Sequence, residues 1–466
     1  MSDFIGFANN LLWNNVLIYL LVGAGIWFSY KLALLQVRHF PHMFKILFNK
    51  SNSDKKIISS FQALMTSLAA RVGTGNLAGV AIAITLGGPG AIFWMWIIAF
   101  IGMATGFAES LLGQLYKVRN SDGEFRGGPA YYITMGLSKP WLASGFSLCI
   151  FIGYGLVFSS VQANTIADAL QNAYQVDATY SGMVIVVLAA FIFIGGVRAV
   201  ARTASVIVPI MGLAYLLLAL YICLINFQQI PAVFMTIFSS AFGLQEAGSG
   251  ALGAAIINGV KRGLYSNEAG SGTVPHAAAC ATPNPHHPAA QGYVQMLGVF
   301  IDTIVVCTAT ALMILLVLGT ETSDLTGIRL TQYAITEHVG HWGNHFISLA
   351  ICLFCFTSII ANYVYAESNL HLFKLDNAYG RWSFILIFLS MTFWGSIAAL
   401  PDVWALADLS LGILTVINVA VILVLTPTIV AVTKDYNQQL QGNKSPRFIL
   451  TNSDKIQGYV TKNIWK

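Results

Sequence analysis

Long apolar runs alternate with short polar segments along almost the whole chain. A helix needs about 20 apolar residues to cross a hydrocarbon core about 30 Å thick, so each long run is a candidate membrane span. About eleven runs meet this requirement, and they lie near residues 12–34, 57–86, 91–116, 142–171, 180–197, 203–226, 248–278, 290–319, 346–368, 382–400 and 405–431. Backbone polar groups in lipid must be paired within their own segment, which predicts an all-α integral membrane protein.

Two of these spans are interrupted by glycine and polar residues. The second span breaks at 71–76 (Arg-Val-Gly-Thr-Gly-Asn), and the seventh breaks at 265–275 (Tyr-Ser-Asn-Glu-Ala-Gly-Ser-Gly-Thr-Val-Pro). Such residues weaken a helix at a depth where lipid offers no other hydrogen-bond partner. The breaks are five spans apart, and five is an odd number, so they are predicted to cross the membrane in opposite directions.

Discontinuous helices in two inverted halves of a chain are typical of a transporter whose binding site lies near the middle of the bilayer. Unwound amides and helix N-termini suit a carboxylate, while unwound carbonyls and helix C-termini suit a cation. Two such breaks would therefore fit a zwitterion that travels with a cation. Clusters of small residues also occur where membrane helices simply pack closely, and this is the alternative interpretation.

The composition excludes a soluble protein of this length. Hydrophobic residues make up 56% of the chain and charged residues only 9%, whereas about 25% of the residues are charged in a typical soluble domain. The longest polar segments, 36–56 and 432–466, are too short to form a core of their own. The second of these is expected to be a solvated tail or to face lipid headgroups. The first apolar run lacks a signal-peptide pattern and is expected to be a retained span.

Basic residues are distributed unevenly between alternate loops. If the N-terminus lies outside, 20 of the 24 Lys and Arg residues fall in the inner segments, within 31–56, 117–139, 198–202, 374–381 and 434–466. The positive-inside rule therefore predicts an outer N-terminus and a cytoplasmic C-terminus. The same asymmetry accounts for the formal net charge of +5, so no nucleic-acid partner is expected.

Charged residues inside the spans are candidates for function, because an unpaired charge in the bilayer is costly. The acids that we consider are Glu109, Glu268, Asp302 and Glu367, and the basic residues in spans are Arg71, Lys261 and Arg262. Each acid could instead be a structural partner of one of these basic residues, and we favour that interpretation for Glu109 and Glu268. The adjacent Lys261 and Arg262 should lie on the outer side of the second break, where they suggest an outer vestibule or gate.

Catalytic machinery is not visible in the sequence. The chain contains no phosphate-binding glycine loop with lysine, no nucleophile elbow and no zinc-binding helix motif, so we do not expect an enzyme. The six cysteines suggest no disulfide framework. A metal site near His276, His286 and His287 is conceivable, but no carboxylate or thiolate cluster accompanies these residues.

Four segments resemble the alanine or glycine:cation symporter family, also called the sodium:alanine symporters, within the amino acid-polyamine-cation superfamily. They are 72–80 (Val-Gly-Thr-Gly-Asn-Leu-Ala-Gly-Val), 87–91 (Gly-Gly-Pro-Gly-Ala), 127–132 (Gly-Gly-Pro-Ala-Tyr-Tyr) and 259–272, which includes Asn-Glu-Ala-Gly. The resemblance covers nearly the whole chain. It implies a leucine-transporter fold with two inverted five-helix repeats, here about 57–227 and 247–431. Residues 1–56 would add a further span and a basic loop, and 432–466 a basic cytoplasmic tail.

The resemblance also implies a sodium site between the first helix of the first repeat and the third helix of the second. Its ligands here would be the carbonyls of Ala69, Val72 and Phe354 and the hydroxyls of Thr357 and Ser358. Oxygen ligands are those that a hard cation prefers. Considered alone, the polar pair Thr357-Ser358 in an apolar run would more often bond back to its own helix.

For the substrate, the resemblance implies that a carboxylate lies on the amides around Gly73, Thr74 and Gly75, with Asn76 beside it. Asn267 in the second break would contact one end of the zwitterion. Gln162 on the fourth span could contact the substrate too, or make a hydrogen bond between helices instead.

The expected function is secondary transport, in which a small neutral amino acid such as alanine or glycine enters the cell with co-transported sodium. The expected location is the cell membrane, as a multi-pass protein of a bacterial inner or plasma membrane. The nearest alternative is a symporter of the same fold that is coupled to protons through Glu268 or Glu109, or that prefers glutamine or serine. A channel would need a symmetric pore lining, and a membrane enzyme would need clustered His, Asp or Glu. The preferred amino acid, the stoichiometry and the oligomeric state stay open.

Overall fold

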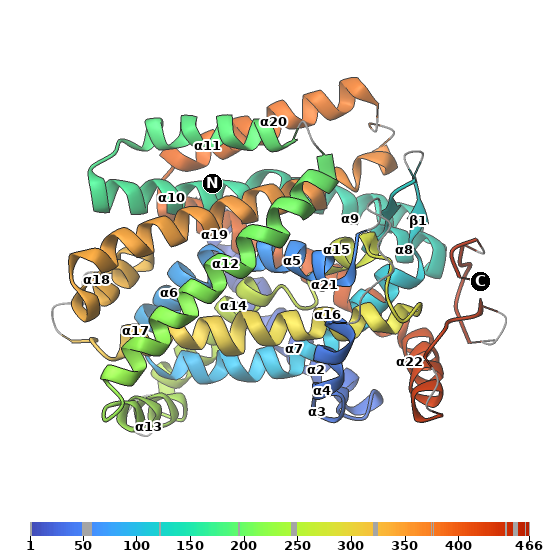
Figure 1. Ribbon diagram of the computed structural model, residues 1–466, viewed down its shortest axis with the longest axis horizontal. Helices are drawn as coiled ribbons and strands as arrows, with labels where there is room; N and C mark the ends of the chain where they lie inside the picture. Colours follow the sequence, from blue (N-terminus) through green and yellow to red (C-terminus); the bar gives the residue numbers. More distant parts are fainter. Residues whose placement is uncertain are drawn as a thin grey trace.

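The computed structural model of the protein describes residues 2–48, 58–120, 123–193, 196–243, 249–319, 325–373, 375, 377–442, 445–450, 455–461 and 463–465. Most of these residues are helical (Figure 1). Within the described ranges, seven helices are long and apolar enough to cross a membrane, or eight if the bent pair Ser60–Arg71 and Gly75–Gly87 forms one span. The other predicted spans do not meet these two criteria as single helices, so the count of eleven stays a prediction.

The first predicted span is built from α1 (Ser2–Leu12), η1 (Trp13–Leu17) and α2 (Ile18–Lys31), and the short helices α3 (Leu35–Arg38) and α4 (Phe40–Leu47) follow it. The next part contains α5 (Ser60–Arg71), η2 (Gly75–Gly79), α6 (Val80–Gly87), α7 (Gly90–Leu115), α8 (Pro129–Leu137), α9 (Pro140–Ile152), η3 (Gly153–Val157), α10 (Phe158–Tyr174), α11 (Ala178–Phe193) and α12 (Gly196–Ile225). A small antiparallel hairpin of β1 (Val118–Arg119) and β2 (Phe125–Arg126), which we did not predict, lies after α7.

The second part begins with α13 (Ile230–Ala241) and continues through α14 (Ser249–Asn267), α15 (Val274–Cys280), α16 (Pro288–Val299), η4 (Phe300–Cys307), α17 (Thr308–Leu315), α18 (Gly327–Val339), α19 (His341–Glu367), η6 (Leu370–Phe373), α20 (Ala378–Ile397) and α21 (Leu400–Val424). Helix α22 (Thr426–Gln441) follows. The division of these helices into two five-helix repeats stays a prediction.

Both predicted interruptions are confirmed. Helix α5 begins at a capping box formed by Ser59 and Gln62, ends at Arg71, and is bent by 52° from the segment that starts at Gly75. Helix α14 ends at Asn267 and α15 begins only at Val274. The helix halves before the first break and after the second pack together, as do α6 and α14 (Figure 1).

The two broken helices are also tied to each other at one end. Ile58, two residues before α5, forms a parallel bridge with Ala281, directly after α15. The amide of Thr282 donates to the carbonyl of Ile58 at 3.0 Å. The first residues of one broken helix are therefore joined by backbone hydrogen bonding to the last residues of the other.

The C-terminal part differs from the prediction in two ways. The predicted span 405–431 is divided, because Pro427 lies in the first turn of α22 and a proline cannot continue the preceding helix. The tail was expected to be solvated or to face lipid headgroups, but part of it packs against the protein. Trp465 is 2% exposed, and its indole N–H donates to the carbonyl of Leu115 at 3.1 Å.

Candidate functional site

The first break presents backbone amides to α10. The amide of Thr74 donates to Gln162 Oε1 at 3.1 Å, and the Thr74 hydroxyl donates to the same oxygen at 2.8 Å. Thr74 and Gln162 are both buried. The side chain of Gln162 therefore bridges two helices, as one of the two interpretations predicted, and it does so at the amides proposed to bind a carboxylate.

Asn76 connects the two breaks. Its side-chain oxygen accepts from the amide of Gly73 at 3.0 Å, which holds the unwound segment. Its side-chain amide donates to Asp302 Oδ1 at 2.8 Å and to the Ser266 hydroxyl at 3.1 Å. Asp302 Oδ2 in turn accepts from Ser266 at 2.6 Å and from Thr303 at 2.7 Å. The sequence analysis singled out Asp302 for its charge but missed Ser266 and Thr303.

Asn267 lies at the start of the second break. Its side-chain oxygen accepts from the amide of Ala269 at 3.0 Å, which fixes the orientation of the side chain. Its side-chain nitrogen is buried and has no hydrogen-bond partner among the described residues. A buried donor without a partner is costly, so this nitrogen is available to an acceptor on a bound molecule.

All five residues of the expected sodium site lie close together. The Ser358 hydroxyl lies 2.8 Å from the carbonyl oxygen of Ala69, 3.0 Å from that of Phe354 and 3.4 Å from that of Val72. The Thr357 hydroxyl donates to the carbonyl of Phe354 at 2.9 Å. Ser358 thus connects α19 to the end of α5, whereas Thr357 makes the bond to its own helix that we had considered as the alternative.

Gly73 lies close to both the Ser358 hydroxyl of the expected sodium site and the Gln162 side chain of the expected substrate site. A Cβ atom on Gly73 would lie 2.5 Å from the Ser358 hydroxyl and 2.8 Å from Gln162 Oε1. On Gly75, a Cβ atom would lie 3.1 Å from Ser266 Cα and from the ring of Tyr265. The close approach at Gly75 is therefore between helices, and the one at Gly73 is between the expected sodium and substrate residues.

We expect Gly73→Ala to weaken both amino-acid binding and the response to sodium, because the new methyl group displaces Ser358 and Gln162 together. Gly75→Leu should abolish amino-acid binding, chiefly by forcing the first break away from α14, while the protein still inserts. Gly79→Ala is the matched control, since a Cβ atom there has ordinary contacts at 3.6 and 3.7 Å. Binding isotherms for alanine at several sodium concentrations would test this. Unchanged binding by the Gly73 and Gly75 variants would rule out this segment as the site.

Glu109 holds the backbone of the second break. Its carboxylate accepts from the amides of Gly270 at 3.1 Å and Gly272 at 3.0 Å, and from the Asn418 side chain at 2.8 Å. Both glycines have positive φ, 94° and 82°, which glycine adopts without strain. Glu268 accepts from the Thr273 hydroxyl at 2.7 Å. Neither Glu109 nor Glu268 forms a salt bridge with Arg71, Lys261 or Arg262 among the described residues. The favoured pairing therefore stays a prediction, supported by the electrostatic interaction of both acids with Arg71.

Arg71 is an unusual buried cation. It is 2% exposed, and its Nη1 donates to the carbonyl of Gln295 at 3.4 Å. Its Nε and Nη2 have no hydrogen-bond partner among the described residues. The guanidinium interacts electrostatically with Glu109, Glu268 and Asp302 without direct contact. One cation thus faces three carboxylates around the two breaks.

Lys261 and Arg262 share a partner that the sequence analysis did not consider. Asp408 on α21 accepts two bonds from Arg262, at 2.8 and 2.7 Å, and lies 2.6 Å from Lys261 Nζ. Its position within the last predicted span was a signal that could have revealed it. Glu367 pairs with Arg126, at 3.2 Å, and with Arg381, at 3.6 Å.

A row of aromatic rings leads from this charge cluster to the breaks. The Arg262 guanidinium lies 4.5 Å from the Trp404 ring centre, and Trp404 lies 4.7 Å from Tyr265. Tyr265 stacks on Phe158 at 5.2 Å, and Phe158 stacks on Tyr154 at 4.3 Å. A row of four rings therefore connects the Arg262 guanidinium to η3.

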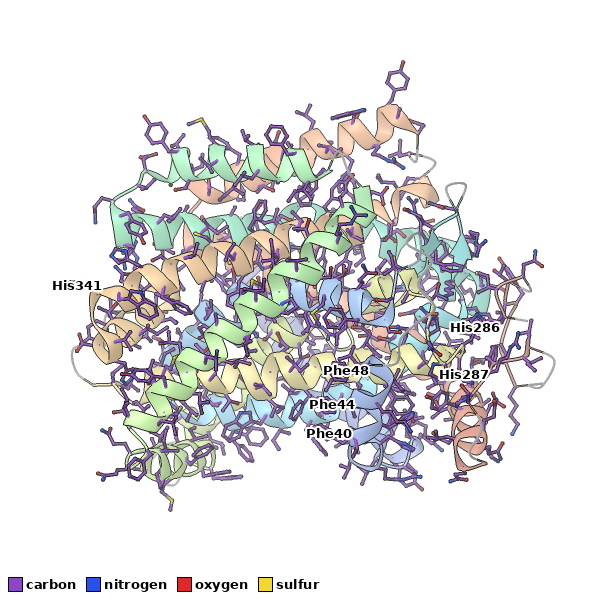
Figure 2. All side chains as sticks on the ribbon, in the orientation of Figure 1. Phe40, Phe44, Phe48, His286, His287 and His341 are labelled. Carbon is purple, nitrogen blue, oxygen red and sulfur yellow. The ribbon has the colours of Figure 1, made fainter. Side chains whose placement is uncertain are left out.

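The histidines considered for a metal site make other contacts. His276 bonds to the Asn369 side chain at 3.0 Å, and His287 bonds to Asp435 at 3.1 Å. His286 and His287 lie in the loop before α16, at the end of the molecule where α22 lies (Figure 2). Among the described residues, no group of three or more His, Cys, Asp or Glu side chains is placed to hold a metal ion.

Comparisons with known proteins agree with this architecture. The model of the sodium:alanine symporter family matches residues 1–450. A probable sodium/glutamine symporter of Bacillus subtilis (strain 168) is 43% identical over 98% of this chain and 96% of its own length. A sodium/proton-dependent alanine carrier protein of Bacillus sp. (strain PS3) is 38% identical over 86% of this chain and 93% of its own.

Among solved structures, a manganese transporter of Eremococcus coleocola has a similar fold. It superposes with a TM-score of 0.51 over 84% of this chain and 83% of its own, at 12% sequence identity. At this identity the similarity concerns the fold alone.

Proposed function

Because the chain belongs to the sodium:alanine symporter family, we propose that it carries a small neutral amino acid into the cell together with sodium. Members of this family are transporters and not enzymes. The observation that carries the proposal is the position of Ser358, whose hydroxyl lies within 3.4 Å of three carbonyl oxygens from α5, the first break and α19. Sodium would take these oxygens together with the hydroxyls of Ser358 and Thr357.

The amino acid would bind beside this site, at the two breaks. Gln162 Oε1 accepts two hydrogen bonds from Thr74 that a carboxylate oxygen could accept equally well. We propose that the substrate carboxylate displaces Gln162 from Thr74 and reaches the amide of Gly75. The unpartnered nitrogen of Asn267 would donate to the same carboxylate, and Asp302 beside Asn76 would face the ammonium group.

Coupling follows from the short connection between the two sites. Val72 contributes a sodium ligand, and Gly73 and Thr74 directly follow it in the chain. Sodium binding would therefore fix the backbone that binds the carboxylate, so each ligand should favour the other. Rocking of one helix bundle against another around this fixed site would give alternating access.

Uptake by proteoliposomes tests the proposal. Labelled alanine should accumulate when an inward sodium gradient is imposed, and should not when a proton gradient replaces it. Counterflow with glycine, serine and glutamine would then define the substrate range. Uptake that saturates equally without sodium would overturn the proposal.

Proton coupling is the second candidate, because one relative at 38% identity is named as sodium/proton-dependent. Glu268 is a stronger candidate for the proton site than Glu109, whose carboxylate already accepts three hydrogen bonds. In that case Glu268→Gln would abolish the response to a proton gradient, while substitutions at Ser358 and Thr357 would have little effect.

The orientation in the membrane is also a proposal, and it predicts labelling results. Ser51 and Ser445 should face the cytoplasm and Ser323 the outside; Ser51 and Ser323 lie outside the described residues. We expect Ser445→Cys to react with an impermeant thiol reagent only in inverted vesicles, and His341→Cys, at the exposed start of α19, only in intact cells. The parent protein, with its six cysteines, is the control. Labelling of Ser445→Cys from outside would reverse the proposed orientation.

A further inference from the structure

A groove lies between the end of α2 and the junction of α21 with α22. Its volume is about 700 Å³. Its walls combine apolar and basic side chains, of which the argument uses Trp27, Lys31, Val424, Lys434, Asp435 and Lys455. These residues come from the N-terminal span, from α21 and α22, and from the tail, so the groove joins three parts of the chain that are far apart in sequence.

The basic side of the groove is formed by three lysines. Lys31, Lys434 and Lys455 are all exposed, and none of them forms a salt bridge with a described residue. The Lys31 ammonium lies 4.6 Å from the centre of the Trp27 ring, which holds it at the edge of the groove. The groove therefore presents three cationic groups that the protein itself does not neutralise.

Asp435, the acidic residue in the groove, is hydrogen-bonded to side chains other than the three lysines. Asp435 Oδ2 accepts from His287 Nε2 at 3.1 Å and from Gln439 Nε2 at 3.0 Å. The hydrogen bond from His287 holds the pKa of the Asp435 carboxyl below its usual value. Asp435 thus stays ionised but is directed toward its own neighbours, and the balance of charge in the groove is positive.

The other side of the groove is apolar and continues onto the surface of the spans. Trp27 is 41% exposed and Val424 is 57% exposed, each on a helix long and apolar enough to cross the membrane. The Trp27 indole N–H donates to the Thr426 hydroxyl at 3.3 Å. Tryptophan with one polar contact and an exposed ring is typical of the boundary between lipid and water.

The neighbouring helix α4 supports this boundary. Phe40, Phe44 and Phe48 follow one side of the segment (Figure 2), and Phe48 is 73% exposed. Lys45 on the same helix is also exposed. A short helix with an apolar side and basic residues lies in the plane of a membrane surface. Helix α4 lies beside α22, since His42 contacts the Tyr436 hydroxyl at 2.9 Å, so both the groove and α4 have features of a membrane surface.

We propose that this groove binds the headgroup of an anionic phospholipid. The phosphodiester would pair with Lys31, Lys434 and Lys455, and the acyl chains would run over Trp27 and Val424 along α2 and α21. Basic pockets between membrane helices bind anionic headgroups in this way. A free phosphate ion would use the lysines but not the apolar side. The proposal depends on the protein crossing a membrane, and not on the coupling ion or the amino acid.

The bound lipid would have a structural effect. It would connect the N-terminal span to α22 and, through Lys455, to the tail that packs at this end of the molecule. We therefore expect an anionic lipid to stabilise the intact protein, and not only to surround it.

The experiment compares lipids on the full-length protein, purified and delipidated in a neutral detergent. Phosphatidylglycerol should bind in native mass spectra and raise the unfolding temperature, whereas phosphatidylcholine and inorganic phosphate should do neither. Lys31→Gln combined with Lys434→Gln should weaken phosphatidylglycerol binding by about 25-fold, at about fivefold for each lysine near a membrane surface. Lys45→Gln is the matched control and should leave the affinity unchanged.

Three results would overturn the proposal. One is equal binding of phosphatidylcholine, which would indicate a merely apolar groove. Another is equal stabilisation by inorganic phosphate, which would indicate a site for free anions. The third is equal weakening by Lys45→Gln, which would indicate attraction to the whole basic surface. Because all three lysines are exposed, these variants are expected to fold.

Discussion

Ser358→Ala is expected to weaken the response of amino-acid binding to sodium by about ten- to hundredfold. The hydroxyl of Ser358 is the group that α19 directs at the carbonyls of Ala69 and Val72. Its removal would leave sodium with fewer ligands, at a cost of about 1.5 to 3 kcal/mol by analogy with a lost hydrogen bond to a charged group. The measurement is the affinity for alanine as a function of sodium concentration, at two pH values.

Binding linkage is reciprocal, so the same variant should bind alanine weakly at low sodium and recover as sodium is raised. Thr357→Ala should have a similar effect, because Thr357 is the other hydroxyl of the proposed site. Ser348→Ala is the control, since Ser348 is buried on the same helix but bonds to Gln332 instead. An unchanged sodium response in both variants, together with a decisive effect of Glu268→Gln, would favour proton coupling.

Asp408→Asn should strongly destabilise the folded protein, because it leaves Lys261 and Arg262 without their shared carboxylate. Asp408 and Arg262 have side chains only 5% and 4% exposed. Removing one partner from a buried ion pair costs about 3 to 5 kcal/mol, since the remaining charge is left unpaired. We expect a large loss of thermal stability and of alanine uptake, measured on the same purified protein.

Two further variants separate this effect from a general loss of charge. Lys261→Gln added to Asp408→Asn should restore part of the stability, because it returns the cluster to a single positive charge. Asp168→Asn breaks an exposed pair with Arg329, whose side chain is 48% exposed. Its cost should be about 0 to 1 kcal/mol. If Asp408→Asn lowered thermal stability and alanine uptake as little as Asp168→Asn does, the buried cluster would not be needed for either.

The two breaks could be predicted from the sequence because their cause is local. Glycine and polar residues in the middle of an apolar run disfavour a helix wherever the rest of the chain lies. The residues around them were harder to predict. Asp408 follows Arg262 by 146 residues, and only the packing of α21 against α14 brings their side chains together.

The resemblance to a known family contributed what local pattern could not. Nothing in the run around Ser358 indicates that its hydroxyl points at α5 and not at its own helix. The resemblance paired these segments, and the hydroxyl contacts both.

The packing of the tail was not predicted, because its local sequence is misleading. A basic and polar segment resembles a solvated one, and the burial of Trp465 depends on a partner surface near Leu115, about 350 residues earlier in the chain.

The bond between Thr282 and Ile58 offers a local reporter of motion. It is part of the parallel bridge that joins the ends of two broken helices. The Thr282 amide proton can exchange with solvent deuterium only when the two ends separate, so its exchange rate measures how often they do. If the ends part when the carrier opens on this side, ligands that hold it closed should slow the exchange of this one amide. Amides within α7 should exchange at an unchanged rate.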